Sequence, residues 1–158
     1  MQKTALGVLR IALGFIFLWA FFDKLLGLGF ATPAARAWMA GGSPTTGFLK
    51  SAAGTFAPFF NSLSGNMMVD WLFMLGLLGI GTALILGIGM KIATYAGSLL
   101  LLLMYLAVYP PTTNPILDDH LIYIIVLFVL LYTNAGEYLG LGKTWKKSKL
   151  VKQYSILG

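Results

Sequence analysis

The chain contains no cysteine, a single histidine and few charged residues. Because cysteine is absent from all 158 residues, thiolate nucleophiles, disulfides, iron–sulfur clusters and cysteine-bound zinc are excluded. One histidine, His120, is too few for a multi-histidine metal centre and argues against a haem held by the protein. Any redox chemistry would therefore need a diffusible cofactor or one held by a partner.

The shortage of charge is accompanied by an excess of apolar residues. Charged residues make up 10% of the chain and hydrophobic ones 58%, with a mean hydropathy of +0.84, whereas soluble domains are about 25% charged. A bilayer crossing takes about 20 helical residues. Four apolar runs meet that length, at residues 5–26, 67–88, 92–109 and 118–139. The sequence predicts an all-α, four-helix transmembrane bundle in one domain, residues 1–142, whose first run is an uncleaved span rather than a signal peptide.

Residues 29–66 are too polar and too interrupted by glycine and proline to cross a membrane. Thr32-Pro33 and Ser43-Pro44 each resemble a helix N-cap followed by proline, so short helices are expected in this segment. We expect it to form an extracytoplasmic lid over one end of the bundle. At the other turns, glycines at 87 and 89 predict a tight hairpin between the second and third spans, and Pro110-Pro111 should end the third.

Positive charge is concentrated at one end of the chain. Of the eleven lysines and arginines, five lie in the tail, residues 143–158. The net charge of +6 beside a membrane span fits anionic lipid headgroups rather than nucleic acid. Lys3, Lys91 and the tail should share one side, because the connection 110–119 has no positive residue; both termini are therefore predicted to be cytoplasmic.

Charged side chains on the first and fourth spans fall at matching depths. Helical spacing places Arg10 opposite Glu137, and Lys24 opposite Asp119, if the two spans are antiparallel neighbours. We expect buried ion pairs there, with Arg10 and Glu137 fixing helix register; a proton path is the alternative. Two further carboxylates at helix ends, Asp23 and Asp70, are also assigned to structural ion pairs.

Asp118, Asp119 and His120 lie together at the start of the fourth span. Histidine exchanges protons near neutral pH, and a neighbouring carboxylate can orient it. Asp118 is expected to cap the helix, whereas Asp119 and His120 are the candidates for proton transfer. A solvated helix end is the competing interpretation.

Two stretches of the sequence carry a resemblance. The first runs from Arg10 to Trp19 and on through Phe22-Asp23-Lys24-Leu25, and the second leads from Asn114-Pro115 to Asp118-Asp119-His120. Together they resemble the DoxX/DoxD family of small four-span membrane proteins, and residues 47–60 are similar to its DoxD branch. The resemblance implies a prokaryotic plasma-membrane subunit of a thiosulfate:quinone oxidoreductase, which joins two thiosulfates into tetrathionate, passes the electrons to a quinone and works with a second subunit, DoxA.

In that case Arg36, Lys50 and Lys24 would hold the anionic substrate, and His120 with Asp119 would handle the quinone's protons. Trp38 or the phenylalanines of the lid would flank the quinone ring, although an interfacial tryptophan usually only anchors a span. No haem, metal or iron–sulfur cluster is expected. A different function stays open: a non-catalytic accessory subunit that packs in a larger membrane complex through its third span and a contact stripe on the second. The stripe consists of Gly76, Gly79/Ile80, Ala83 and Gly87. A transporter is disfavoured, because no internal repeat or broken helix is found in the sequence.

Overall fold

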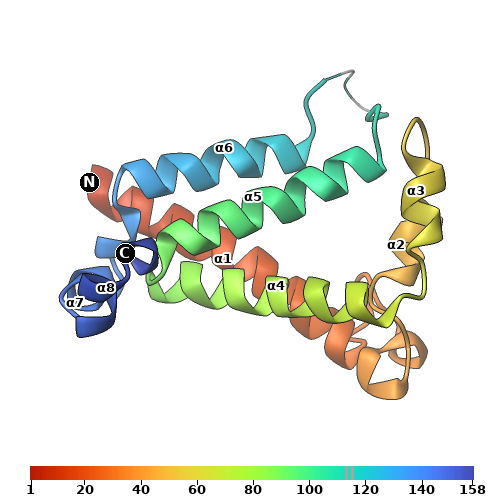
Figure 1. Ribbon diagram of the computed structural model, residues 1–158, viewed down its shortest axis with the longest axis horizontal. Coiled ribbons are helices and arrows are strands. Elements are labelled where there is room, and N and C mark those ends of the chain that lie inside the picture. The colour runs from red at the N-terminus through yellow and green to blue at the C-terminus, as the bar shows by residue number, and fades with distance from the viewer. Residues whose placement is uncertain (113, 115) are drawn as a thin grey trace.

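Four long helices make up the body of the protein. The structure, a computed structural model, describes residues 1–112, 114 and 116–158. The long helices are α1 (Gln2–Leu26), α4 (Met67–Leu86), α5 (Met90–Ala107) and α6 (Asp119–Tyr132), and they run along the long axis of the molecule (Figure 1). No strand occurs in the described ranges, so the all-α prediction is confirmed.

Three of these helices, α1, α4 and α5, are long and apolar enough to cross a membrane. The predicted fourth span, residues 118–139, contains a shorter apolar helix, α6. It has 14 residues, about 21 Å of helix, and ends at Tyr132. Asn134 then takes a left-handed conformation with φ of 53°, and a 3-10 helix, η3 (Ala135–Glu137), follows. α6 therefore ends where the backbone changes direction at Asn134, although the span predicted from hydropathy continues to residue 139.

The helices pack in the order α1, α4, α5, α6. The main neighbour of α1 is α4, and α6 lies mainly along α5. The predicted pairing of the first and fourth spans is found at one end only, where α1 contacts η3, and α1 touches α6 little. α1 and α4 approach closely at two points, and at each of them a glycine of one helix faces the backbone of the other. A Cβ on Gly81 would lie 2.9 Å from the backbone nitrogen of Leu18, and one on Gly14 would lie 2.9 Å from that of Ile85. Gly79 of the predicted contact stripe faces open space.

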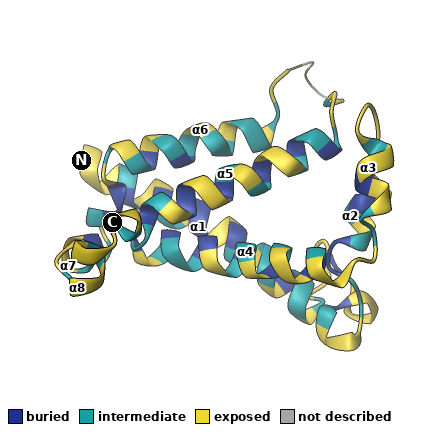
Figure 2. Ribbon diagram, viewed as in Figure 1, coloured by how far each residue is buried: buried dark blue, intermediate teal, exposed yellow. Residues whose placement is uncertain are grey.

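Buried side chains of the four helices form one apolar core. Met74 and Leu84 of α4 meet Leu127 and Leu130 of α6 there, all without exposed surface. Exposed positions lie on the outer faces of the helices (Figure 2). Many of these are large and apolar, including Phe15, Leu75, Leu99 and Ile125, which fits contact with lipid.

The expected hairpin between the second and third long helices is confirmed. Gly87 ends α4 with φ of 73°, its N–H bonds to the carbonyl of Ala83, and α5 begins at Met90. The third span ends at Ala107, ahead of Pro110 and Pro111 as predicted.

The segment between α1 and α4 holds short helices: η1 (Ala34–Arg36), η2 (Trp38–Ala40), α2 (Thr46–Lys50) and α3 (Ala57–Ser62). In Figure 1, α2 and α3 lie at the opposite end of the molecule from both termini. Leu49, Ala52 and Phe60 pack on Ala107, at the end of α5. We keep the name lid for residues 29–66.

The chain ends in three short helices, α7 (Gly142–Lys146), α8 (Lys149–Gln153) and η4 (Ser155–Leu157). They fold back on the end of the bundle that carries the α4–α5 turn. Nζ of Lys91 donates to the carbonyl of Ser155 at 2.7 Å, and Nε1 of Trp145 donates to the carbonyl of Leu157 at 2.5 Å. The tail is thus attached to α5 by a hydrogen bond.

Candidate functional site

A cavity of about 420 Å³ lies between the lid and the start of α6. The lid contributes Ser51, Ala53 and Gly54, and the segment after α5 contributes Val108, Pro110, Pro111 and Thr112. The remaining wall comes from the cluster singled out in the sequence: Asp118, Asp119 and His120. The structure therefore brings the predicted proton-transfer residues under the lid.

Asp118 and His120 form a tight pair in the wall of this cavity. Asp118 is the N-cap of α6, and its Oδ1 accepts a hydrogen bond from the N–H of Leu121 at 3.2 Å. Its Oδ2 lies 2.6 Å from Nδ1 of His120, and the side chains are 12% and 21% exposed. An ionised carboxylate only accepts hydrogen bonds, so Nδ1 carries a proton. Nε2 is then the ring nitrogen available to exchange a proton with a ligand.

Asp119 also lines the cavity, and its expected part in proton transfer stays a prediction. Its side chain is exposed and has no hydrogen bond to any described residue, whereas Asp118 both caps the helix and orients His120. The sequence pattern indicated only a capping role for Asp118. An N-cap carboxylate has two oxygens, however, and the second can reach a side chain in the first turn, which is the feature that could have identified it.

Hydrogen bonds hold together the chain segments that surround the cavity. The N–H of Thr55 donates to the carbonyl of Tyr109 at 3.3 Å, which ties the lid to the end of α5. On the opposite wall, the hydroxyl of Tyr105 donates to the carbonyl of Ile116 at 2.8 Å, and Oδ1 of Asn114 accepts from Ile116 and Leu117. Pro115, the other residue of the Asn114-Pro115 motif, lies outside the described residues.

The four predicted substrate-binding residues do not line this cavity. Arg36 and Lys50 are exposed on the lid, and Lys24 is half-buried near the end of α1. Trp38 packs edge-on against Trp71, with 4.6 Å between ring centroids. A role for these residues in binding an anion stays a prediction.

Asp23 and Asp70 are buried, but neither forms the expected ion pair. The carboxylate of Asp23 accepts hydrogen bonds from the N–H groups of Phe30 and Ala31, at 3.2 and 3.0 Å. Oδ1 of Asp70 accepts from the hydroxyl groups of Ser43 and Thr45, at 2.9 and 2.5 Å, and from the N–H of Thr45. Both carboxylates therefore attach the lid to the long helices.

The predicted pairing of Arg10 with Glu137 is wrong. The guanidinium of Arg10 is fully buried and donates only to backbone carbonyls, those of Leu84, Ile85, Ala135, Tyr138 and Leu139. Glu137 instead pairs with Lys146 of α7 at 2.7 Å. Nor is an ion pair found between Lys24 and Asp119, both of which the structure describes.

The hydrogen bond from Lys146 lowers the pKa of the Glu137 carboxyl below its usual value. The charges of Lys146, Lys143 and Lys3 add to this effect and partial burial opposes it. Glu137 is therefore ionised at neutral pH and lies in a positively charged environment at the end of the bundle that carries the tail.

No group of three or more histidine and acidic side chains suited to a metal ion is found in the described part of the chain. No protein-family model, curated protein or solved structure matches this sequence. The site must therefore be interpreted from its own geometry.

Proposed function

We propose that the protein is an integral membrane subunit of a quinone-linked oxidoreductase in a prokaryotic plasma membrane. In this arrangement α6 is a fourth crossing, both termini are cytoplasmic and the lid is extracytoplasmic. The distribution of charge supports this topology, because Lys91 and the lysine-rich tail lie at the end opposite α2 and α3 (Figure 1).

The observation that carries the proposal is the Asp118–His120 pair in the wall of the lid cavity. Reduction of a quinone consumes two electrons and two protons, so its oxygens need a proton donor at the point of binding. With Nδ1 bonded to Asp118 at 2.6 Å, His120 would donate from Nε2 and be reprotonated from the outer solution. The cavity volume, about 420 Å³, lies within the range of small-molecule sites.

Thiosulfate is the electron donor that the DoxD resemblance implies. Two thiosulfates lose two electrons as their sulfurs join to give tetrathionate, and one quinone takes up those electrons with two protons to give the quinol. The protein has no cysteine, so the sulfur atoms cannot pass through an enzyme persulfide. Electrons would then pass directly to the quinone or through a second subunit. Arg36 and Lys50 on the lid would attract the anion.

The test is thiosulfate-dependent reduction of a soluble quinone by the protein purified with its partner and reconstituted in lipid. His120→Gln and Asp118→Asn should each lower kcat at least 10-fold, because general acid catalysis typically contributes about 10²-fold or more. Glu137→Gln, at the opposite end of the molecule, is the matched control and should keep full activity. Full activity in both site variants would remove the proposed proton donor.

The short α6 favours a second candidate function. A helix of about 21 Å is shorter than the hydrocarbon core of a bilayer, about 30 Å, and such helices are accommodated by local thinning or by association with other helices. A non-catalytic accessory subunit of a larger membrane complex would provide that association. Recovery of the chain only in a stoichiometric assembly, whose activity does not change with His120→Gln, would support this function over the first.

A further inference from the structure

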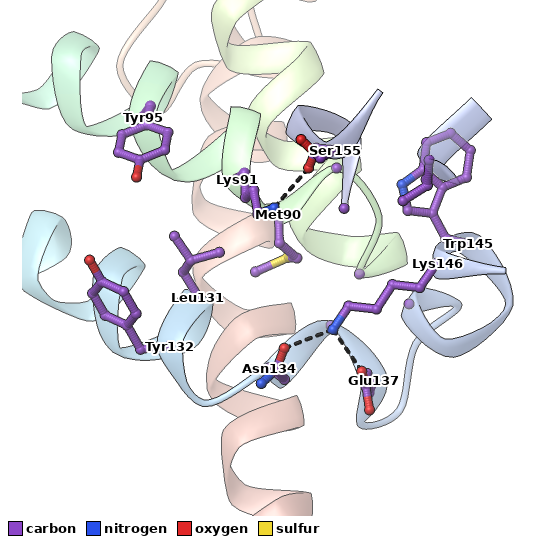
Figure 3. A pocket seen from close by; sticks show the side chains of 16 residues that line it. Met90, Lys91, Tyr95, Leu131, Tyr132, Asn134, Glu137, Trp145, Lys146 and Ser155 are labelled. Atoms are coloured by element: carbon purple, nitrogen blue, oxygen red, sulfur yellow. Dashed lines mark hydrogen bonds and ion pairs between the residues drawn. The ribbon is translucent and has the colours of Figure 1, made fainter. Parts of the chain in front are cut away.

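A second cavity, of about 590 Å³, lies at the opposite end of the bundle from the lid. Its walls come from the α4–α5 turn, the end of α6 and the C-terminal tail. In Figure 3 the charged groups lie on the side nearer the tail, beside Trp145, whereas Tyr95, Leu131 and Tyr132 lie on the side toward α5 and α6. The cavity is therefore amphipathic.

The charged wall contains two lysines from different elements. Nζ of Lys91, in α5, donates to the carbonyl of Ser155 at 2.7 Å. Nζ of Lys146, in α7, donates to Asn134 and Glu137, both at 2.7 Å. An ammonium group has three donors, so both lysines retain hydrogen-bonding capacity. Among the lining side chains Glu137 is the only acidic one, against two lysines, so these side chains together carry a net positive charge.

The apolar wall continues from the lysines toward the middle of the bundle. Tyr95 lies four residues after Lys91 and so about 6 Å further along the same face of α5. Tyr132 and Leu131 of α6 complete this wall. Tyr95 and Tyr132 are 53% and 75% exposed on helix faces that are otherwise apolar, and tyrosine at such a position is typical of the membrane interface.

We propose that this cavity binds one anionic phospholipid. Lys91 and Lys146 would contact the headgroup phosphate, and the first part of an acyl chain would lie along Tyr95, Leu131 and Tyr132. A free anion would use only the charged wall, whereas a phospholipid uses both. Basic pockets between membrane helices on the cytoplasmic side are suited to anionic headgroups. The site is distinct from the diffuse attraction between the tail lysines and a charged membrane surface.

Binding can be measured on the full chain, purified in detergent and titrated with phosphatidylglycerol or phosphatidylcholine of the same acyl chains, with native mass spectrometry as the readout. Phosphatidylglycerol should bind selectively with one molecule per chain. The double variant Lys91→Gln/Lys146→Gln should weaken that binding roughly 30-fold, at about 1 kcal/mol per basic residue. Equal binding of the two lipids would overturn the proposal.

The matched control removes the same charge from the exposed part of the tail. Lys149→Gln/Lys152→Gln should change the affinity less than about threefold, since each lysine lies outside the cavity; an equal loss in both double variants would indicate diffuse attraction and overturn the site. Because Lys91 and Lys146 also hold the tail, Lys91→Arg/Lys146→Arg is included and should keep the affinity. Full displacement of the lipid by millimolar inorganic phosphate would reassign the cavity to a soluble anion.

Discussion

Nη2 of Arg10 in α1 donates a hydrogen bond of 3.0 Å to the carbonyl of Tyr138, a residue 128 positions later in the chain. The same guanidinium donates to Leu84 and Ile85, in the last turn of α4. Carbonyls at a helix C-terminus carry partial negative charge and lack partners within the helix. The buried cation is therefore stabilised without a carboxylate, and it joins the first helix, the end of α4 and the segment after α6.

Arg10→Ala should lower the free energy of unfolding in detergent by about 3 kcal/mol or more, because several buried carbonyls lose their donor together. Arg10→Lys should recover only part of the loss, since one ammonium cannot reach carbonyls on three segments as a planar guanidinium does. Denaturant unfolding followed by circular dichroism provides the measurement. A lysine variant as stable as the wild type would show that charge alone is needed.

The partners of Arg10 could not be predicted from the sequence, because backbone carbonyls leave no pattern of residue types. Pairing rules match one charged side chain with another, and they led to Glu137. The glycines near the guanidinium were the better indication. A Cβ on Gly140 would lie 2.7 Å from Nη2 of Arg10, and one on Gly87 would lie 3.1 Å from Cζ. Glycines in two connecting segments can thus indicate where a distant arginine side chain is buried.

The long helices were predictable because a bilayer requires long apolar runs. Their order of packing was not, since apolar helix faces are alike in composition. At the candidate site, His120 was found because a lone histidine among carboxylates is unusual in so apolar a chain. The choice between Asp118 and Asp119 depended on the direction of the N-cap side chain, which only the local backbone determines.

The contact between α1 and α4 predicts opposite effects for two glycines of α4. In Gly81→Ala the new methyl group would lie 2.7 Å from Cγ of Leu18 and 2.9 Å from its backbone nitrogen, so the helices must separate. The free energy of unfolding should fall by about 1–3 kcal/mol. Gly79→Ala meets no atom within 4 Å and should be neutral or stabilising by up to about 1 kcal/mol. Equal effects in denaturant titrations would contradict this packing.

Gly54 sets the distance between the lid and α5. Its φ is 86°, and a Cβ there would lie 2.2 Å from the carbonyl of Tyr109, which is backbone and cannot move aside independently. Gly54→Ala should therefore detach this part of the lid and expose its amides, seen as faster hydrogen exchange at Thr55. Gly47→Ala, in α2, meets open space and should leave exchange unchanged. Protection of Thr55 in the Gly54 variant would argue against the contact.

Because Glu137 and Lys146 form an ion pair, attachment of the tail to the bundle should weaken at low pH. The folded-state pKa of Glu137 is lowered, first by the hydrogen bond from Lys146. The stabilisation that this pair gives to the folded state is therefore complete at pH values above the ordinary pKa of glutamate, and it is lost as pH falls through the folded-state pKa. A double-mutant cycle of Glu137→Gln and Lys146→Met should give a coupling of about 0.2–1 kcal/mol at pH 7, typical of partly exposed pairs. The rate of proteolysis after Lys147 would measure this coupling, which should vanish at pH values below the folded-state pKa of Glu137. A coupling that persists there would show that it does not depend on the ionised carboxylate of Glu137.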